Sequence, residues 1–163
     1  MPNGIDCQER LFKEEIALEQ FDQQMEQRVW KRVRGEEQPP ITGLQGLAAA
    51  EQNEAAVYLM LSRQLQGPEK AMLRRIFEQE NAHAAILRGI HNAMTGQRIT
   101  LRTAPVQPET PEIALRKCYA RKLKTLSEYE SRENDREYGA VFSHLARQER
   151  EHCAVILQIL GSR

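Results

Sequence analysis

Apolar residues near the start of the chain recur at intervals of three, four and seven, the spacing that places side chains on one face of an α-helix. This stripe is formed by Leu11, Leu18, Phe21, Met25 and Val29. Asp6 is a suitable N-cap, and Gly35 ends the pattern. The pattern predicts an amphipathic helix over residues 6–34, followed by a linker rich in glycine and proline. We therefore divide the chain into an N-terminal helix and arm, residues 1–38, and a main domain, residues 39–163.

Four further stretches are dominated by helix-forming residues and show almost no strand-like alternation. They cover residues 47–66, 69–95, 111–130 and 136–160, each bounded by turn-forming residues. The first and last connections are short, whereas the middle one is long, contains two prolines and ends at a third, Pro111. Short, long and short connections predict two antiparallel hairpins joined by one crossover, which is the connectivity of ferritin-like bundles. The predicted fold is all-α: a ferritin-like four-helix bundle plus the extra N-terminal amphipathic helix.

Composition excludes several functional classes. The chain contains 23 basic and 23 acidic residues, so it lacks the basic excess typical of nucleic-acid binding. Its longest apolar run, residues 55–61, is far shorter than the roughly 20 residues that span a bilayer. The first residues do not form a signal peptide. Three cysteines, none spaced as CxxC, predict reduced thiols in a cytoplasmic protein.

Two of the predicted helices carry a glutamate and a histidine three residues apart, which places both side chains on one face. The pairs are Glu80 with His83 and Glu149 with His152. Apolar residues flank each pair at helical spacing, so both faces should point inward. A buried carboxylate beside a buried imidazole needs a compensating partner. A divalent metal is one such partner, because iron, manganese and zinc all accept these ligands.

The motif Glu-x-x-His is too short to indicate a metal site by itself. Its matching position in two repeated hairpins is the stronger argument for one. Glu51 precedes Tyr58 by seven residues on the first helix of the first hairpin. With these features, residues 47–160 resemble the rubrerythrin branch of the ferritin-like superfamily. The resemblance implies a di-iron or di-manganese centre for peroxide reduction, oxygen reduction or iron oxidation. It also implies a separate electron donor, because the missing CxxC pairs leave no rubredoxin-type centre in this chain. The metal ligands that it implies are Glu51, Glu80, His83, Glu149 and His152.

The second hairpin departs from this pattern at Lys122, which lies seven residues before Tyr129, where the family has a glutamate. A protonated ammonium is not a metal ligand and repels a cation. Three carboxylates with one ammonium leave a local charge near −2, which favours one bound ion, iron before manganese or zinc, over two. A full dinuclear centre and a metal-free site also stay open. Lys122 could occupy the second cation position and pair with Glu80 and Glu149, or it could extend outward to solvent.

Several other residues have a structural interpretation beside a functional one. Tyr58 and Tyr129 are expected to pack in the core rather than relay electrons. Cys118, one turn before the lysine, is a candidate to line the site, and Cys153 is expected to be a buried thiol. Glu54 is expected to be an ordinary exposed helix carboxylate.

Two functions are consistent with these patterns. The first is a rubrerythrin-like metal protein, an oxidoreductase of the peroxidase or oxidase kind or an iron oxidase. The second is a non-catalytic bundle that has lost metal chemistry and serves assembly or partner binding. Under either, the N-terminal apolar stripe predicts a homodimer surface.

Overall fold

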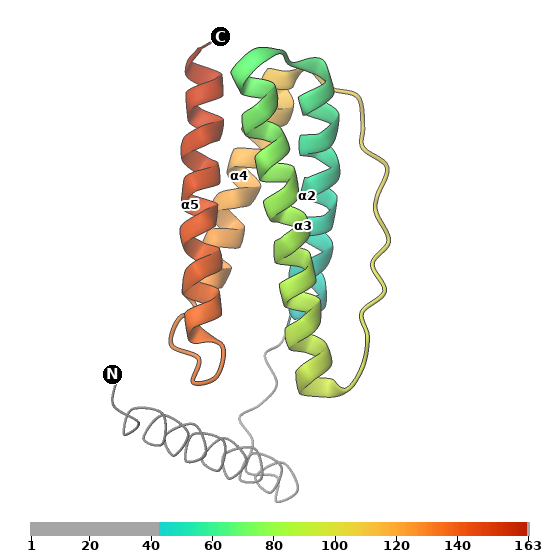
Figure 1. Cartoon of the computed structure of the whole chain (residues 1–163), viewed down its shortest axis with the longest axis vertical. Coiled ribbons are helices and arrows are strands. Elements are labelled where there is room, and N and C mark those ends of the chain that lie inside the picture. The colour runs from blue at the N-terminus through green and yellow to red at the C-terminus, as the bar shows by residue number, and fades with distance from the viewer. Residues whose placement is uncertain (1–42, 163) are drawn as a thin grey trace, which may run out of the picture. The chain divides into compact units, whose positions relative to one another are not determined.

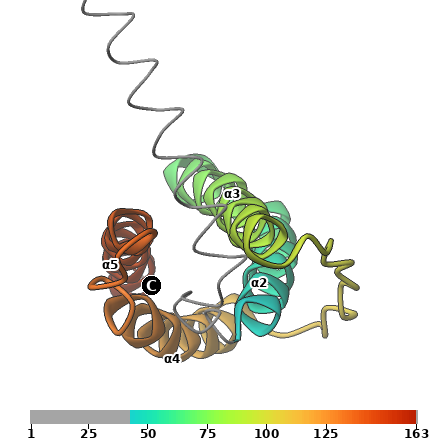
Figure 2. The same ribbon diagram turned by 90° about the horizontal axis from the view of Figure 1, so that it is seen from below.

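The computed structural model describes residues 43–162, which form an all-α bundle with four helices in this part of the chain (Figure 1). The helices are α2 (Leu44–Gln64), α3 (Gly67–Thr95), α4 (Pro111–Glu130) and α5 (Gly139–Gly161). They form two antiparallel hairpins, and their order around the bundle is α3, α2, α4, α5 (Figure 2). The predicted ferritin-like four-helix bundle is thus confirmed. The helix predicted over residues 6–34 lies outside the described residues.

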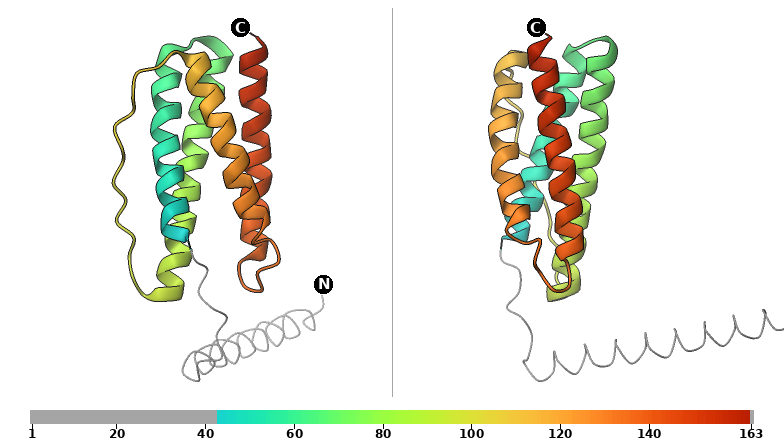
Figure 3. Two further views of the ribbon diagram at one scale, coloured as in Figure 1. Left: turned by 180° about the vertical axis from the view of Figure 1, so that it is seen from behind. Right: turned by 90° about the vertical axis from the view of Figure 1, so that its left-hand side faces the viewer.

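The long crossover between α3 and α4 runs along the outside of α2 (Figure 3). The Ala104 backbone N–H donates to Asn53 Oδ1 on α2 at 2.8 Å, which fixes the crossover to that helix. Because of this connection, α4 begins at the end of the bundle where α2 finishes. The second hairpin can therefore pack beside the first.

Glycine and proline set most helix ends close to their predicted positions. Pro68 lies in the first turn of α3, and Gly96, with φ 70°, ends that helix in the left-handed region. The turn before α5 is longer than predicted, and the helix begins at Gly139 rather than near residue 136. A Cβ at Gly139 would collide with the Glu133 backbone carbonyl, so this tight turn requires glycine.

Apolar side chains from all four helices fill one end of the bundle, where Leu61, Leu73, Leu115 and Ile156 are fully buried. Towards the middle, buried polar side chains replace them. These are Glu51, Glu54, Glu80, His83, Lys122, Glu149 and His152. Such burial is costly unless the groups satisfy one another or a bound ion. Within the described part of the chain, no helix combines the length and apolar character needed to cross a membrane.

Candidate metal centre

All four helices contribute charged or imidazole side chains to the centre of the bundle. α2 provides Glu51, α3 provides Glu80 and His83, α4 provides Lys122, and α5 provides Glu149 and His152, each at most 1% exposed. One potential ligand atom from each of Glu51, Glu80, His83 and Glu149 lies within 4.8 Å of the others. The structure therefore brings together the inward-facing residues that the sequence singled out. His152 lies beside this group of four rather than within it.

Lys122 lies among the carboxylates, so the alternative in which it extends to solvent is wrong. Its Nζ atom is 2.5 Å from Glu80 Oε2, 2.9 Å from Glu149 Oε2 and 3.2 Å from Glu51 Oε2. Burial opposes a charge on this amine, but the surrounding carboxylates outweigh burial and hold the pKa of Lys122 well above its usual value. The centre thus contains a fixed ammonium that offsets part of its negative charge.

The two histidines are oriented by glutamines from the opposite hairpin. His83 Nε2 is 2.9 Å from Gln148 Oε1, and His152 Nε2 is 3.0 Å from Gln79 Oε1. An amide oxygen can accept but not donate, so each Nε2 carries a proton. In a neutral imidazole the other nitrogen, Nδ1, then presents its lone pair to the carboxylates. Neither glutamine was predicted to belong to the centre, although each directly precedes a glutamate of the repeated motif.

Several buried atoms at this centre lack a hydrogen-bond partner among the described residues. They are Glu80 Oε1, both carboxylate oxygens of Glu149, and Nδ1 of His83 and His152, although Glu149 Oε2 is in ion-pair contact with Lys122 at 2.9 Å. His83 Nδ1 lies 3.0 Å from Glu149 Oε1, but neither atom has a proton to donate when the imidazole is neutral. Unsatisfied buried acceptors are unfavourable. A divalent transition metal accepts lone pairs from carboxylate oxygen and imidazole nitrogen together, so these residues fit a metal ion.

The carboxylates differ in proton affinity although they share one environment. Burial and the neighbouring carboxylates raise the pKa of Glu80 well above its usual value despite Lys122. Burial also acts on Glu51 and Glu149, but there Lys122, hydrogen bonds and the neighbouring histidines together outweigh it and lower the pKa. Burial lowers the pKa of a histidine, yet at His83 the nearby Glu149, Glu51 and Gln148 together outweigh burial and raise that pKa, because they stabilise the protonated ring. Protons therefore compete with a cation most strongly at Glu80 and His83.

Glu54 is a buried member of this centre, and its expected exposure was wrong. It is 5% exposed, and its Oε2 accepts from the Tyr58 hydroxyl at 3.3 Å and lies 3.7 Å from Lys122 Nζ. Its Oε1 pairs with Arg121. Burial raises the pKa of Glu54 in spite of both cations. The spacing of the two glutamates indicates this burial, because Glu54 follows Glu51 by three residues and shares its helical face.

The two tyrosines are buried as expected, and each also donates to a carboxylate of α2. Tyr58 donates to Glu54, and the Tyr129 hydroxyl donates to Glu51 Oε1. Cys118 is buried near the centre, where Arg121 Nη2 lies 3.3 Å from its sulfur. Burial raises the pKa of the Cys118 thiol to about 12, so the sulfur stays protonated at neutral pH.

The fold and the centre together define a ferritin-like bundle with a carboxylate–histidine cluster inside. A family model, rubrerythrin, matches residues 47–140, more than half of the chain, and the chain belongs to this family. The match ends within the first turn of α5, so Glu149 and His152 join the centre through the geometry above. No match was found among curated proteins or among solved structures. The family and the buried cluster fit a metal-binding role.

Proposed function

We propose that the protein binds one divalent transition-metal ion per chain, iron before manganese or zinc, through Glu51, Glu80, His83 and Glu149, with His152 beside it. The observation that carries this proposal is the set of buried acceptors without partners, which face one another across the two hairpins. Three carboxylates and one ammonium leave a local charge of −2 when all are ionised, which matches one divalent ion. Lys122 takes the place of a second ion between Glu80 and Glu149.

The bound ion would supply redox chemistry for peroxide or oxygen reduction or for iron oxidation. The residues of the chain position it and exclude water. Tyr129 holds Glu51, and the two glutamines hold the histidines. Lys122 holds one carboxylate oxygen of each of Glu51, Glu80 and Glu149. Peroxide reduction to water needs two electrons, so a separate electron donor belongs to this proposal. So do the homodimer and the cytoplasmic location expected from the sequence.

A second function is supported by the close contacts of Lys122. With an ammonium 2.5 to 3.2 Å from three carboxylates, the centre is partly compensated without any metal. Protonation of both histidines would then place a donor opposite Glu149 and Glu80, at 3.0 Å and 2.8 Å. In this alternative the bundle is a structural module for assembly or partner binding.

Metal content separates these two functions. Full-length protein expressed with added iron and manganese should contain about one transition-metal ion per chain by mass spectrometry. Anomalous scattering from a crystal would identify the metal. Glu149→Gln should lower the content, whereas Glu128→Gln, on the outer part of α4, should not. Less than about 0.2 ions per chain, with no binding on titration, would leave the metal-free alternative.

Removing the acceptor from Gln148 should weaken metal binding although Gln148 does not touch the metal. We expect Gln148→Leu to lower the affinity by about 10–100-fold, because His83 loses the partner that keeps the proton on Nε2. Gln148→Glu keeps an acceptor and should retain most of the affinity. Titration calorimetry gives the affinity, and ¹⁵N NMR of the metal-free protein gives the His83 tautomer. A normal Nε2–H tautomer in Gln148→Leu would contradict the role of this glutamine.

A further inference from the structure

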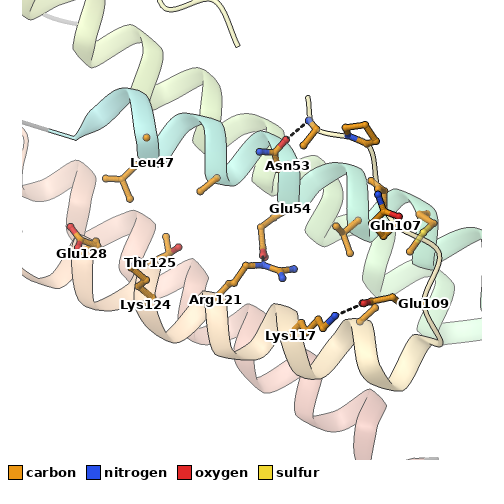
Figure 4. A pocket seen from close by; sticks show the side chains of 18 of the residues that line it. Leu47, Asn53, Glu54, Gln107, Glu109, Lys117, Arg121, Lys124, Thr125 and Glu128 are labelled. Atoms are coloured by element: carbon orange, nitrogen blue, oxygen red, sulfur yellow. Dashed lines mark hydrogen bonds and ion pairs between the residues drawn. The ribbon is translucent and has the colours of Figure 1, made fainter. Parts of the chain in front are cut away.

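A cavity of about 730 Å³ lies between α2, α4 and the crossover (Figure 4). Its walls are largely apolar, with Leu47, Val57, Met60, Pro105 and Val106 among the lining residues. Two ion pairs also line it, Glu54 with Arg121 and Glu109 with Lys117 (Figure 4). The cavity is large enough for a hydrated ion or a small molecule, and it has charged groups in its wall.

Glu54 belongs both to this cavity and to the buried centre. One carboxylate oxygen pairs with Arg121 in the cavity, and the other lies 3.7 Å from Lys122 Nζ inside the bundle. The neighbouring ligands Glu51, Glu80 and Glu149 are at most 1% exposed. A cation that reached them through this cavity would therefore meet the carboxylate of Glu54 first.

We propose that the cavity is the route by which divalent cations reach the buried centre, with Glu54 taking them up and Arg121 closing the route while the two are paired. This inference rests on the proposed metal function and concerns how the same centre is loaded. Cation and carboxylate attract each other, whereas the guanidinium repels the cation and occupies the carboxylate oxygen that faces the cavity.

Exposure explains why Arg121 is the partner that moves. The Arg121 side chain is 48% exposed, so its charge can separate into water at low cost, whereas the Glu54 side chain is 6% exposed. After the pair opens, Glu54 is a buried carboxylate with a strong demand for a cation. Lys122 Nζ, 3.7 Å from Glu54, weakens the hold of Glu54 on the ion, so Glu54 takes the ion up without keeping it.

The second ion pair of the cavity provides a matched control. Glu109 and Lys117 line the same cavity and form the same kind of pair, with side chains 27% and 56% exposed. Among the described residues, neither side chain of this pair forms a hydrogen bond or ion pair with a member of the buried centre. Arg121→Gln and Lys117→Gln each remove one positive charge from the cavity. Only Arg121→Gln frees the Glu54 carboxylate from its ion pair.

The test measures the rate of cobalt(II) uptake by full-length, metal-free protein in stopped flow, followed by the cobalt absorption bands. Arg121→Gln should load roughly tenfold faster than the unmodified protein. Glu54→Gln should load roughly tenfold slower, because the carboxylate that takes up the ion is gone. Lys117→Gln should load at the original rate, and all four proteins should reach the same final stoichiometry.

Equal acceleration by Arg121→Gln and Lys117→Gln would overturn the inference, because cavity charge alone would then explain the rate. Unchanged rates in both Arg121→Gln and Glu54→Gln would show that cations enter elsewhere. Should Glu54→Gln fail to fold, the comparison of the Arg121 and Lys117 variants still decides. Failure of the proposed function has a different signature, since the unmodified protein would then bind no cobalt at equilibrium.

Discussion

Replacing Lys122 with glutamate should raise the metal content from about one ion per chain to about two. Lys122 Nζ lies between the carboxylates of Glu80 and Glu149, at 2.5 Å and 2.9 Å. The substitution removes the positive charge from this position and supplies a terminal carboxylate to the second half of the centre. His152 Nδ1, 2.8 Å from Glu80 Oε1, is the nitrogen ligand on that side. Metal analysis after saturation and removal of excess ion measures the change.

Lys124→Glu is the matched control, because it makes the same change of charge on the same helix at an exposed position. Its metal content should equal that of the unmodified protein. If folded Lys122→Glu still binds one ion, Lys122 does not stand in for a second metal. The centre would then be limited by its other ligands, and the comparison of the two hairpins as equivalent halves would be wrong.

The architecture could be predicted because it depends on local signals. Gly96 and Pro111 mark the ends of the long crossover, and connection length alone separates the ferritin-like order from a simple up-and-down bundle. Two helix starts are displaced by three residues: α2 begins earlier than predicted, at Leu44, and α5 begins later, at Gly139. The displacement of α5 goes with the close approach of Gly139 to the Glu133 backbone. That contact forms only when the turn closes, so the spacing of residues gave no sign of it.

The centre was predictable where it follows helical register and unpredictable where it depends on contacts between helices. Register placed Glu80 and His83 on one inward face, and the structure buries both. Register could not decide whether Lys122 turns inward, because its long side chain can reach solvent from the edge of a helix. It also could not show that Gln148 on α5 reaches His83 on α3, since that hydrogen bond crosses between the two hairpins.

Lys122→Met should lower the free energy of unfolding of the metal-free protein by about 3–5 kcal/mol. The substitution keeps most of the side-chain volume but leaves Glu51, Glu80 and Glu149 without the ammonium that they surround. Uncompensated buried carboxylates must then bind protons or stay charged at high cost, and both are unfavourable near neutral pH. Denaturant unfolding in the presence of a chelator measures the loss.

The direction of the pH dependence follows from the same charges. In the unmodified protein Lys122 lowers the pKa of Glu51 and Glu149 against the effect of burial. Without Lys122 the effect of burial is opposed only by the remaining hydrogen bonds and histidines, so we expect the folded-state pKa values of Glu51 and Glu149 to rise above the unfolded ones. A carboxyl group whose pKa is higher in the folded state makes the protein less stable as pH rises from the unfolded pKa to the folded pKa. The loss of unfolding free energy caused by Lys122→Met should therefore be smaller in acid than at neutral pH.

Added metal should raise the free energy of unfolding of Lys122→Met by more than it raises that of the unmodified protein. A ligand that binds only the folded state, at one hundred times its dissociation constant, adds about 2.7 kcal/mol. The variant should gain more than this single-site amount, because loss of the ammonium leaves its carboxylates with a greater demand for cations. Lys124→Met, at an exposed position, should stay within about 0.5 kcal/mol of the unmodified protein with or without metal. A Lys122→Met protein as stable as the original in chelator would mean that the ammonium does not compensate these carboxylates, and the one-metal centre would lose its electrostatic basis.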